Sequence, residues 1–300
     1  MKLNHTAAGV LDVAWLGSGR EDGTPVLLLH GFPYDVHTYD EVAPILAGAG
    51  CRVIVPWLRG YGPTRYLSDS TPRSGEQAAL GADVIALMDA LGIERAVLAG
   101  YDWGGRGACV ASALWPERVL GLVTGGGYNI QNIAASAKPA LPEVELKLWY
   151  HYYFHGERGR AGLTAYRREF CKQLWRLWSP TWAFDDVAYE RTAASFDNPD
   201  FVDVVIHSYR HRFALVAGDP AYAAIEARLA AQPVISVPTV ALDGEDSGIA
   251  TAKSTASRAK FTGPWESVSI KGAGHNLPQE APQAFAGAVL KLCPAAPASP

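Results

Sequence analysis

Short apolar runs typical of β-strands recur along the chain and alternate with helical patterns. The runs cover residues 26–30, 51–55, 96–99, 119–124, 239–242 and 266–270. The clearest helical pattern lies at residues 74–91, where apolar side chains recur at three- and four-residue steps on one face. Because strands that alternate with helices form a mostly parallel sheet covered by helices, the chain is predicted to fold as an α/β protein.

The alternation stops between about residues 128 and 227. In this segment β-runs are scarce and aromatic residues are dense, and four of the nine tryptophans lie here: Trp149, Trp175, Trp178 and Trp182. We interpret it as a helical insertion over the C-terminal ends of the strands, where ligands bind in open α/β sheets. Most of its aromatic side chains are expected to form its own core, and others can line an apolar pocket. The predicted domains are an α/β core of residues 1–127 and 228–300 and a helical cap of residues 128–227.

Charge and composition argue against a large polyanionic partner. The chain has 26 basic and 30 acidic side chains, a net charge of −4, and no run of like charge that would attract nucleic acid or an anionic membrane. No stretch approaches the roughly 18 apolar residues that span a bilayer, and the N-terminus lacks an apolar signal core. We therefore expect a cytoplasmic protein that binds a small molecule. The sequence does not determine the oligomeric state, and a homodimer is one alternative. No function is predicted for the Pro/Ala-rich tail, residues 294–300.

The cysteines do not suggest a metal site. Cys51, Cys109, Cys171 and Cys293 are widely spaced, and no histidine follows them at metal-ligand spacing. They are predicted to be buried apolar side chains, and no metal or other cofactor is expected.

The most informative motif is Gly100-Tyr101-Asp102-Trp103-Gly104-Gly105, between the run at 96–99 and a helix-compatible segment at 106–114. A residue on so sharp a strand-to-helix turn takes strained dihedral angles, and small neighbours two positions away on either side leave room for it. The pattern is G-x-S-x-G with Asp in place of Ser, which makes Asp102 the candidate nucleophile. The hexapeptide alone also fits a glycine-rich turn with a capping Asp.

Two further motifs follow in the order expected of one enzyme superfamily. His30-Gly31-Phe32-Pro33 follows an early strand and Gly274-His275 follows the last one. Together with the Asp102 motif, they resemble the epoxide hydrolase and dehalogenase branch of the α/β-hydrolases over essentially the whole chain. The resemblance implies an eight-stranded, mostly parallel sheet flanked by helices, with a helical cap. It also implies a cis Phe32–Pro33 bond and an oxyanion hole formed by the N–H groups of Phe32 and Trp103.

The branch chemistry explains an Asp nucleophile. A carboxylate is ionised at neutral pH, so Asp102 can attack a saturated carbon without a base and form an alkyl ester. His275 would then activate the water that hydrolyses this ester. The acid that orients His275 is less defined, because relatives usually read Gly-x-x-Asp where this chain has Ser247. Asp246 is the predicted acid, with Glu245 and Asp243 as alternatives. A second departure is Trp57, where relatives commonly carry Asp.

The cap is expected to decide the substrate. An epoxide needs a proton donor for its oxygen, which a tyrosine hydroxyl can supply. The segments around Tyr150 and Tyr209 resemble those that carry the two ring-opening tyrosines of epoxide hydrolases. Tyr152 lies two helical steps from Tyr150 and is expected on another face. The residues expected at the substrate pocket are His30, Pro33, Arg106, His151 and Tyr152.

The predicted function is therefore hydrolysis of an apolar epoxide through an ester on Asp102. Haloalkane dehalogenases commonly carry a halide-binding Asn where this chain has Phe32. Fluoroacetate dehalogenases are the closer alternative, because they resemble the chain at Phe32-Pro33, at Gly104-Gly105-Arg106 and at His151. They usually carry an Arg directly after the nucleophile, however, where this chain has Trp103. A non-catalytic ligand-binding protein of the same fold is a third alternative.

Overall fold

The structure, a computed structural model, describes residues 1–294, so nearly all of the C-terminal tail lies outside the described residues. Its centre is a nine-stranded sheet. Eight strands follow in the order β1-β2-β4-β3-β6-β7-β8-β9, and the short β5 pairs with β2 outside this path. The strands are β1 Lys2–Ala8, β2 Leu11–Gly19, β3 Pro25–Leu29, β4 Arg52–Pro56, β5 Arg65–Tyr66, β6 Ala96–Gly100, β7 Val119–Gly125, β8 Thr239–Gly244 and β9 Trp265–Ile270.

The predicted α/β fold with a mostly parallel sheet is confirmed. The path from β4 through β3, β6, β7 and β8 to β9 is parallel, whereas β1, β2 and β4 pair antiparallel. All five residues of the central strand β6 are buried. Burial on both faces is typical of parallel strands that are covered by helices, and it explains the unbroken apolar run at this point of the sequence.

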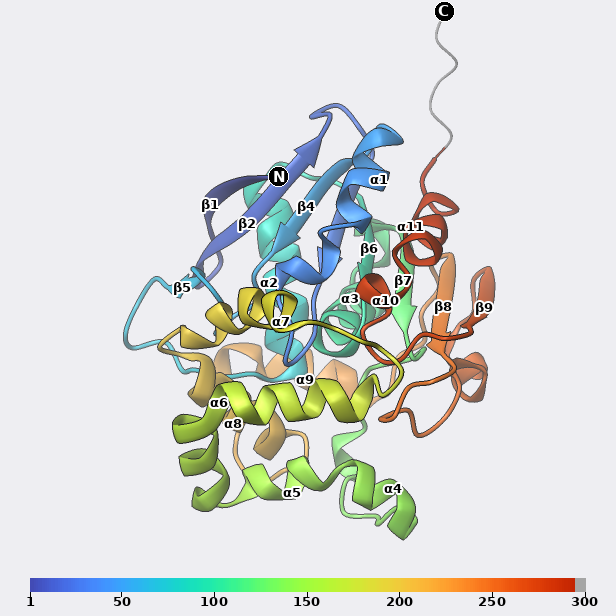
Figure 1. Ribbon diagram of the computed structural model, residues 1–300. Coiled ribbons are helices and arrows are strands. Elements are labelled where there is room, and N and C mark those ends of the chain that lie inside the picture. The colour runs from blue at the N-terminus through green and yellow to red at the C-terminus, as the bar shows by residue number, and fades with distance from the viewer. Residues whose placement is uncertain (295–300) are drawn as a thin grey trace, which may run out of the picture.

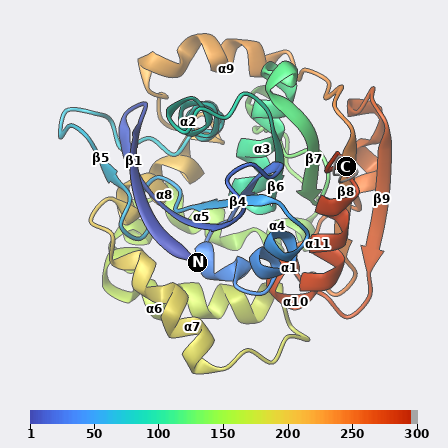
Figure 2. The ribbon, with the colours of Figure 1, turned by 90° about the horizontal axis from the view of Figure 1, so that it is seen from above.

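Helices cover both faces of the sheet (Figure 2). On one face α2 packs against α3, which contacts β6 and β7, and on the other face α1 packs against α11. α2 lies inside the predicted range 74–91. The bounds of the core helices are α1 Val42–Gly48, α2 Gln77–Ala90, α3 Asp102–Leu114, α9 Ala223–Ala230, α10 Leu277–Glu280 and α11 Pro282–Leu290.

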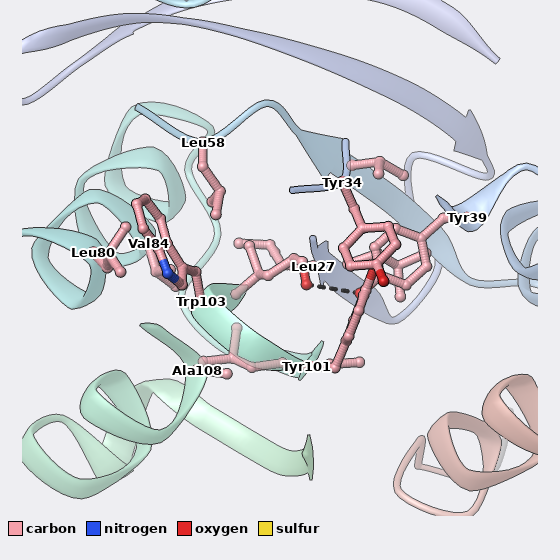
Figure 3. Close-up of a cluster of buried hydrophobic side chains, with 14 of the residues drawn as sticks. Leu27, Tyr34, Tyr39, Leu58, Leu80, Val84, Tyr101, Trp103 and Ala108 are labelled. Carbon is pink, nitrogen blue, oxygen red and sulfur yellow. Dashed lines mark hydrogen bonds between the residues drawn. The ribbon is translucent and has the colours of Figure 1, made fainter. Parts of the chain in front are cut away.

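The hydrophobic core fills the space between the sheet and these helices. Figure 3 shows part of it, with Leu80 and Val84 of α2 and Trp103 and Ala108 of α3 in the same cluster. Trp103 is completely buried in this cluster. The residue after Asp102 is therefore anchored in the core, which holds the turn that carries Asp102.

A helical segment lies between β7 and β8 in the sequence and covers the carboxyl ends of the parallel strands (Figure 1). α5 packs against α6 and α8 within it, whereas α9, which contains the predicted boundary at 227, packs against α2 of the core. Its helices are α4 Pro142–Lys147, α5 Trp149–His155, α6 Glu157–Trp178, α7 Asp186–Ala193 and α8 Phe201–His211. Short 3-10 helices lie at Val36–Tyr39, Pro116–Arg118, Ile133–Ala135, Ala194–Asp197, Pro220–Tyr222 and Ser254–Lys260.

The four cysteines are free thiols. Cys51, Cys109 and Cys171 are buried, as predicted, and Cys293 is half-buried. Within residues 1–294, every helix is too short or too polar to cross a lipid bilayer.

Candidate active site

Asp102 lies on the turn between β6 and α3 with a φ of +51°, a left-handed conformation that is strained for a residue other than glycine. Two glycines make this turn sterically feasible. A Cβ on Gly100 would lie 2.6 Å from the carbonyl carbon of Gly104, and one on Gly104 would lie 2.0 Å from the carbonyl oxygen of Leu29. The spacing that identified Asp102 in the sequence thus reflects close contacts between backbone segments.

The two oxygens of the Asp102 carboxylate contact different groups, backbone N–H groups on one side and His275 on the other. Oδ1 accepts hydrogen bonds from the backbone N–H groups of Phe32, at 2.8 Å, and Trp103, at 2.7 Å. Oδ2 lies 3.5 Å from Nε2 of His275. Burial raises the pKa of Asp102, but His275, the charge of Arg106 and the Phe32 N–H together hold it below its ordinary value. The carboxylate is therefore ionised at neutral pH, as a nucleophile requires.

The Phe32–Pro33 peptide bond beside this carboxylate is cis, as the resemblance implied. The two N–H groups expected to form the oxyanion hole, those of Phe32 and Trp103, both donate to one side chain, that of Asp102.

The loop that carries His275 runs from β9 to α10. The His275 ring lies between aromatic side chains, with its centroid 5.1 Å from that of Trp178 and 5.8 Å from that of Tyr101. Its backbone N–H donates to the hydroxyl oxygen of Ser179, at the end of α6, at 3.1 Å. The end of α6 and the loop after β9 thus both position this histidine.

The structure does not bring Asp246 to His275. Its Oδ2 accepts a hydrogen bond from the Thr181 hydroxyl at 3.1 Å, because this loop packs against the chain that follows α6. Asp243 instead accepts from the backbone N–H and the hydroxyl of Ser254, and Glu245 is exposed. Within residues 1–294, the one carboxylate within ion-pair distance of the His275 ring is that of Asp102. The predicted contact with Asp246 is thus not formed.

Tyr150 of α5 and Tyr209 of α8 lie together above the Asp102 turn. Both are buried, and their ring centroids are 5.3 Å apart. The Tyr209 ring also contacts Phe32, with 5.4 Å between centroids, and Trp103, with 6.0 Å. Burial raises the pKa of both hydroxyl groups above the ordinary value, so both remain protonated donors at neutral pH.

Tyr152 lies on another face of α5, as the helical spacing predicted. It is 43% exposed, and its hydroxyl donates to Glu145 outside the site. It therefore does not share the surroundings of Tyr150.

A cavity of about 580 Å³ adjoins Asp102, His275 and Tyr150. Of the predicted pocket residues, Arg106 and His151 line it, whereas His30, Pro33 and Tyr152 do not. Three further cations that the sequence prediction missed line it as well: Lys147, Arg212 and Lys253.

His30 lies beneath the site. Its Nε2 accepts a hydrogen bond from the Leu58 N–H at 3.1 Å, and burial lowers its pKa to about 4. Pro33 contributes its carbonyl oxygen, which accepts from Nε1 of Trp175 at 2.7 Å. Both residues thus support the fold around the site rather than the cavity wall.

A separate group of potential metal ligands comprises Glu76, His211 and Glu226, whose ligand atoms lie within 4.8 Å of one another. Its carboxylates already accept backbone N–H groups, Glu76 from Asp219 and Glu226 from Ala78, both at 3.0 Å. None of the three lines the cavity. The two carboxylates therefore serve to bind backbone N–H groups.

Comparison with known proteins identifies similar chains. Residues 24–282 match the family described as alpha/beta hydrolase fold. A solved structure of a candidate epoxide hydrolase from Klebsiella pneumoniae is 47% identical, with a TM-score of 0.96 and 97% of each chain covered. Epoxide hydrolase A from Mycobacterium tuberculosis is 28% identical over 91% of each chain. Epoxide hydrolase B from that organism is 33% identical over 152 residues, and the match spans only 42% of that relative's length.

Proposed function

Because this chain belongs to the α/β-hydrolase fold family, we propose that it is an epoxide hydrolase that acts on a small molecule through an ester on Asp102. The similar proteins from Klebsiella pneumoniae and Mycobacterium tuberculosis support the reaction class. The observation that carries the proposal is the packing of two buried tyrosine rings, from separate helices, beside an ionised carboxylate. In this proposal residues 128–227 act as the cap.

In the first step, Oδ2 of Asp102 attacks an epoxide carbon and the carbon–oxygen bond of the ring breaks. The electron pair of that bond goes to the oxygen, which takes a proton from Tyr150 or Tyr209. The product is an alkyl ester of Asp102, and the donor tyrosine becomes a tyrosinate. Because both tyrosines are protonated at neutral pH, either can act as the acid.

In the second step, His275 takes a proton from water as the water oxygen attacks Cγ of the Asp102 ester. The N–H groups of Phe32 and Trp103, which contact Oδ1, stabilise the oxyanion that forms. The ester bond breaks, and the leaving alkoxide takes the proton of the newly formed Asp102 carboxylic acid, which releases the diol and restores the carboxylate. The proton on His275 returns to the tyrosinate through solvent. One epoxide and one water are consumed for each diol.

A fluoroacetate-type dehalogenase is the second candidate function, because Arg106 and His151 line the cavity. It would use the same Asp102 ester, but the buried Trp103 occupies the position of its usual second arginine. A non-catalytic binding protein is a lesser alternative. Turnover assays with styrene oxide, an aliphatic epoxide and fluoroacetate test all three, since release of fluoride without diol formation would replace the proposal and inertness toward all would favour binding alone.

A further inference from the structure

The cavity contains a buried guanidinium group that lacks an ion-pair partner. Arg106 is 7% exposed, and no hydrogen bond or ion pair from its side chain is formed within residues 1–294. Burial lowers the pKa of Arg106 to about 10, so it stays charged at neutral pH. Burying an unpaired charge is unfavourable, and such groups are normally paired with an anion.

A second guanidinium group faces the same cavity. Arg212 directly follows α8, and its Nη1 lies 3.2 Å from Nε2 of His151. Burial and the charges of Arg212 and Arg106 hold the pKa of His151 well below its ordinary value, so the ring is neutral and Nε2 accepts this hydrogen bond. Arg212 also lies 5.7 Å from the centroid of the Tyr209 ring. His151 and Tyr209 therefore orient a cation that has no carboxylate partner among the described residues.

The cavity wall thus carries two guanidinium groups that form no ion pair with a carboxylate among the described residues. The buried carboxylate of Asp243 also lines the cavity, but it accepts hydrogen bonds from the backbone N–H and the hydroxyl of Ser254 instead. A neutral epoxide would leave the guanidinium charge uncompensated, whereas a carboxylate would neutralise it and can accept paired hydrogen bonds from a guanidinium. Lys147, Lys253 and Glu245 also line the cavity, but they are exposed, so solvent screens their charges.

We propose that the substrate is an epoxide bearing a carboxylate, and that Arg106 and Arg212 bind this carboxylate while Asp102 attacks the ring. The inference rests on the proposed function and replaces the apolar substrate that the sequence suggested. Arg106 follows Asp102 by four residues in α3, which is about 6 Å along a helix. The carboxylate therefore lies close to the reacting carbon, as in a short 2,3-epoxy acid.

The test compares glycidate, the smallest such acid, with glycidamide, which has nearly the same shape and no charge. We expect kcat/KM to be at least about 100-fold higher for glycidate, because two charged hydrogen-bonding partners serve only the acid. In Arg212→Gln, and in Arg106→Gln if it folds, this preference should fall below about tenfold. Arg160→Gln, which removes an exposed cap arginine paired with Asp203, is the matched control and should keep it.

A binding measurement separates this inference from the reaction. Glycerate, the hydrolysis product of glycidate, should bind to Asp102→Asn in calorimetry, and adding Arg212→Gln should abolish that binding. On the unaltered protein glycerate should bind more tightly than its neutral amide, a comparison that requires no variant. If glycerate binds in an Arg212-dependent way but no epoxide is turned over, the carboxylate site is supported and epoxide hydrolysis is rejected. Turnover of fluoroacetate alone would lead to the same two conclusions. Equal turnover of glycidate and glycidamide, without glycerate binding, would overturn the inference and leave the proposed function standing.

Discussion

The carboxylate of Glu280 accepts hydrogen bonds from the backbone on both sides of His275. Its Oε2 accepts from the Gly274 N–H at 2.7 Å, and its Oε1 accepts from the Asn276 N–H at 2.9 Å. Oε1 also accepts the Ser179 hydroxyl at 2.6 Å, and that same hydroxyl oxygen accepts from the N–H of His275. One carboxylate in α10 therefore links the end of α6 to the loop of the proposed base.

Replacing Glu280 with Gln should slow hydrolysis of the ester at least about tenfold and change ester formation by less than about twofold. The NH₂ group of the new glutamine would face a backbone N–H that also donates, so one hydrogen bond to Glu280 would be lost. Because a hydrogen bond to a charged group contributes about 1.5–3 kcal/mol, the melting temperature should fall as well. Single-turnover kinetics separates the two steps. Glu266→Gln, which alters an exposed ion pair with Lys291, is the control.

Asp246→Asn should leave ester hydrolysis within about twofold of the unaltered rate, because the Asp246 carboxylate contacts Thr181 rather than His275. The same single-turnover experiment measures it. A loss as large as that in Glu280→Gln would restore Asp246 as the acid that orients the base.

Asp102→Asn should abolish turnover and leave the fold intact, since a neutral amide fits the turn but cannot displace at carbon. Initial rates and circular dichroism of freshly purified protein check this, with deamidation excluded by mass spectrometry. Rates close to those of the unaltered protein would reject Asp102 as the nucleophile.

His275→Gln should permit ester formation and block hydrolysis, so the ester should accumulate. After denaturation under saturating substrate, the peptide containing Asp102 should carry the added mass of the substrate. If that peptide stays unmodified while the variant is inactive, the two-step scheme is wrong.

The single variants Tyr150→Phe and Tyr209→Phe should be impaired but active, because each leaves one hydroxyl near the epoxide oxygen. The double variant should form no ester, because a charged oxygen that loses its last donor costs about 1.5–3 kcal/mol or more in a buried site. Tyr152→Phe, which alters only the contact with Glu145, should change little. Rapid ring opening by the double variant would move the dehalogenase alternative ahead.

Features of the fold and of the site could be predicted from the sequence where they depend on residues a few positions apart. The strand pattern and the position of Asp102 were predictable, because the dihedral angles of a sharp turn depend on residues two positions away, here Gly100 and Gly104. Tyr152 was separated from Tyr150 by helical geometry alone. Arg212 could have been found in the same way, since it follows Tyr209 by three residues and such pairs share a helix face.

The polar partners were decided only by the tertiary structure. The order of the motifs predicts that Asp246 contacts His275, yet its carboxylate accepts a hydrogen bond from Thr181 instead. Glu280 and Ser179 bind the loop that carries His275. A hydrogen bond requires its two atoms to lie within about 3 Å of each other, and a rotation of one loop or helix end changes the partner. Sequence spacing predicts which face of a helix or strand a side chain occupies. The distance between segments about 100 residues apart, such as those of Ser179 and Glu280, instead depends on how α6 packs against the loop after β9.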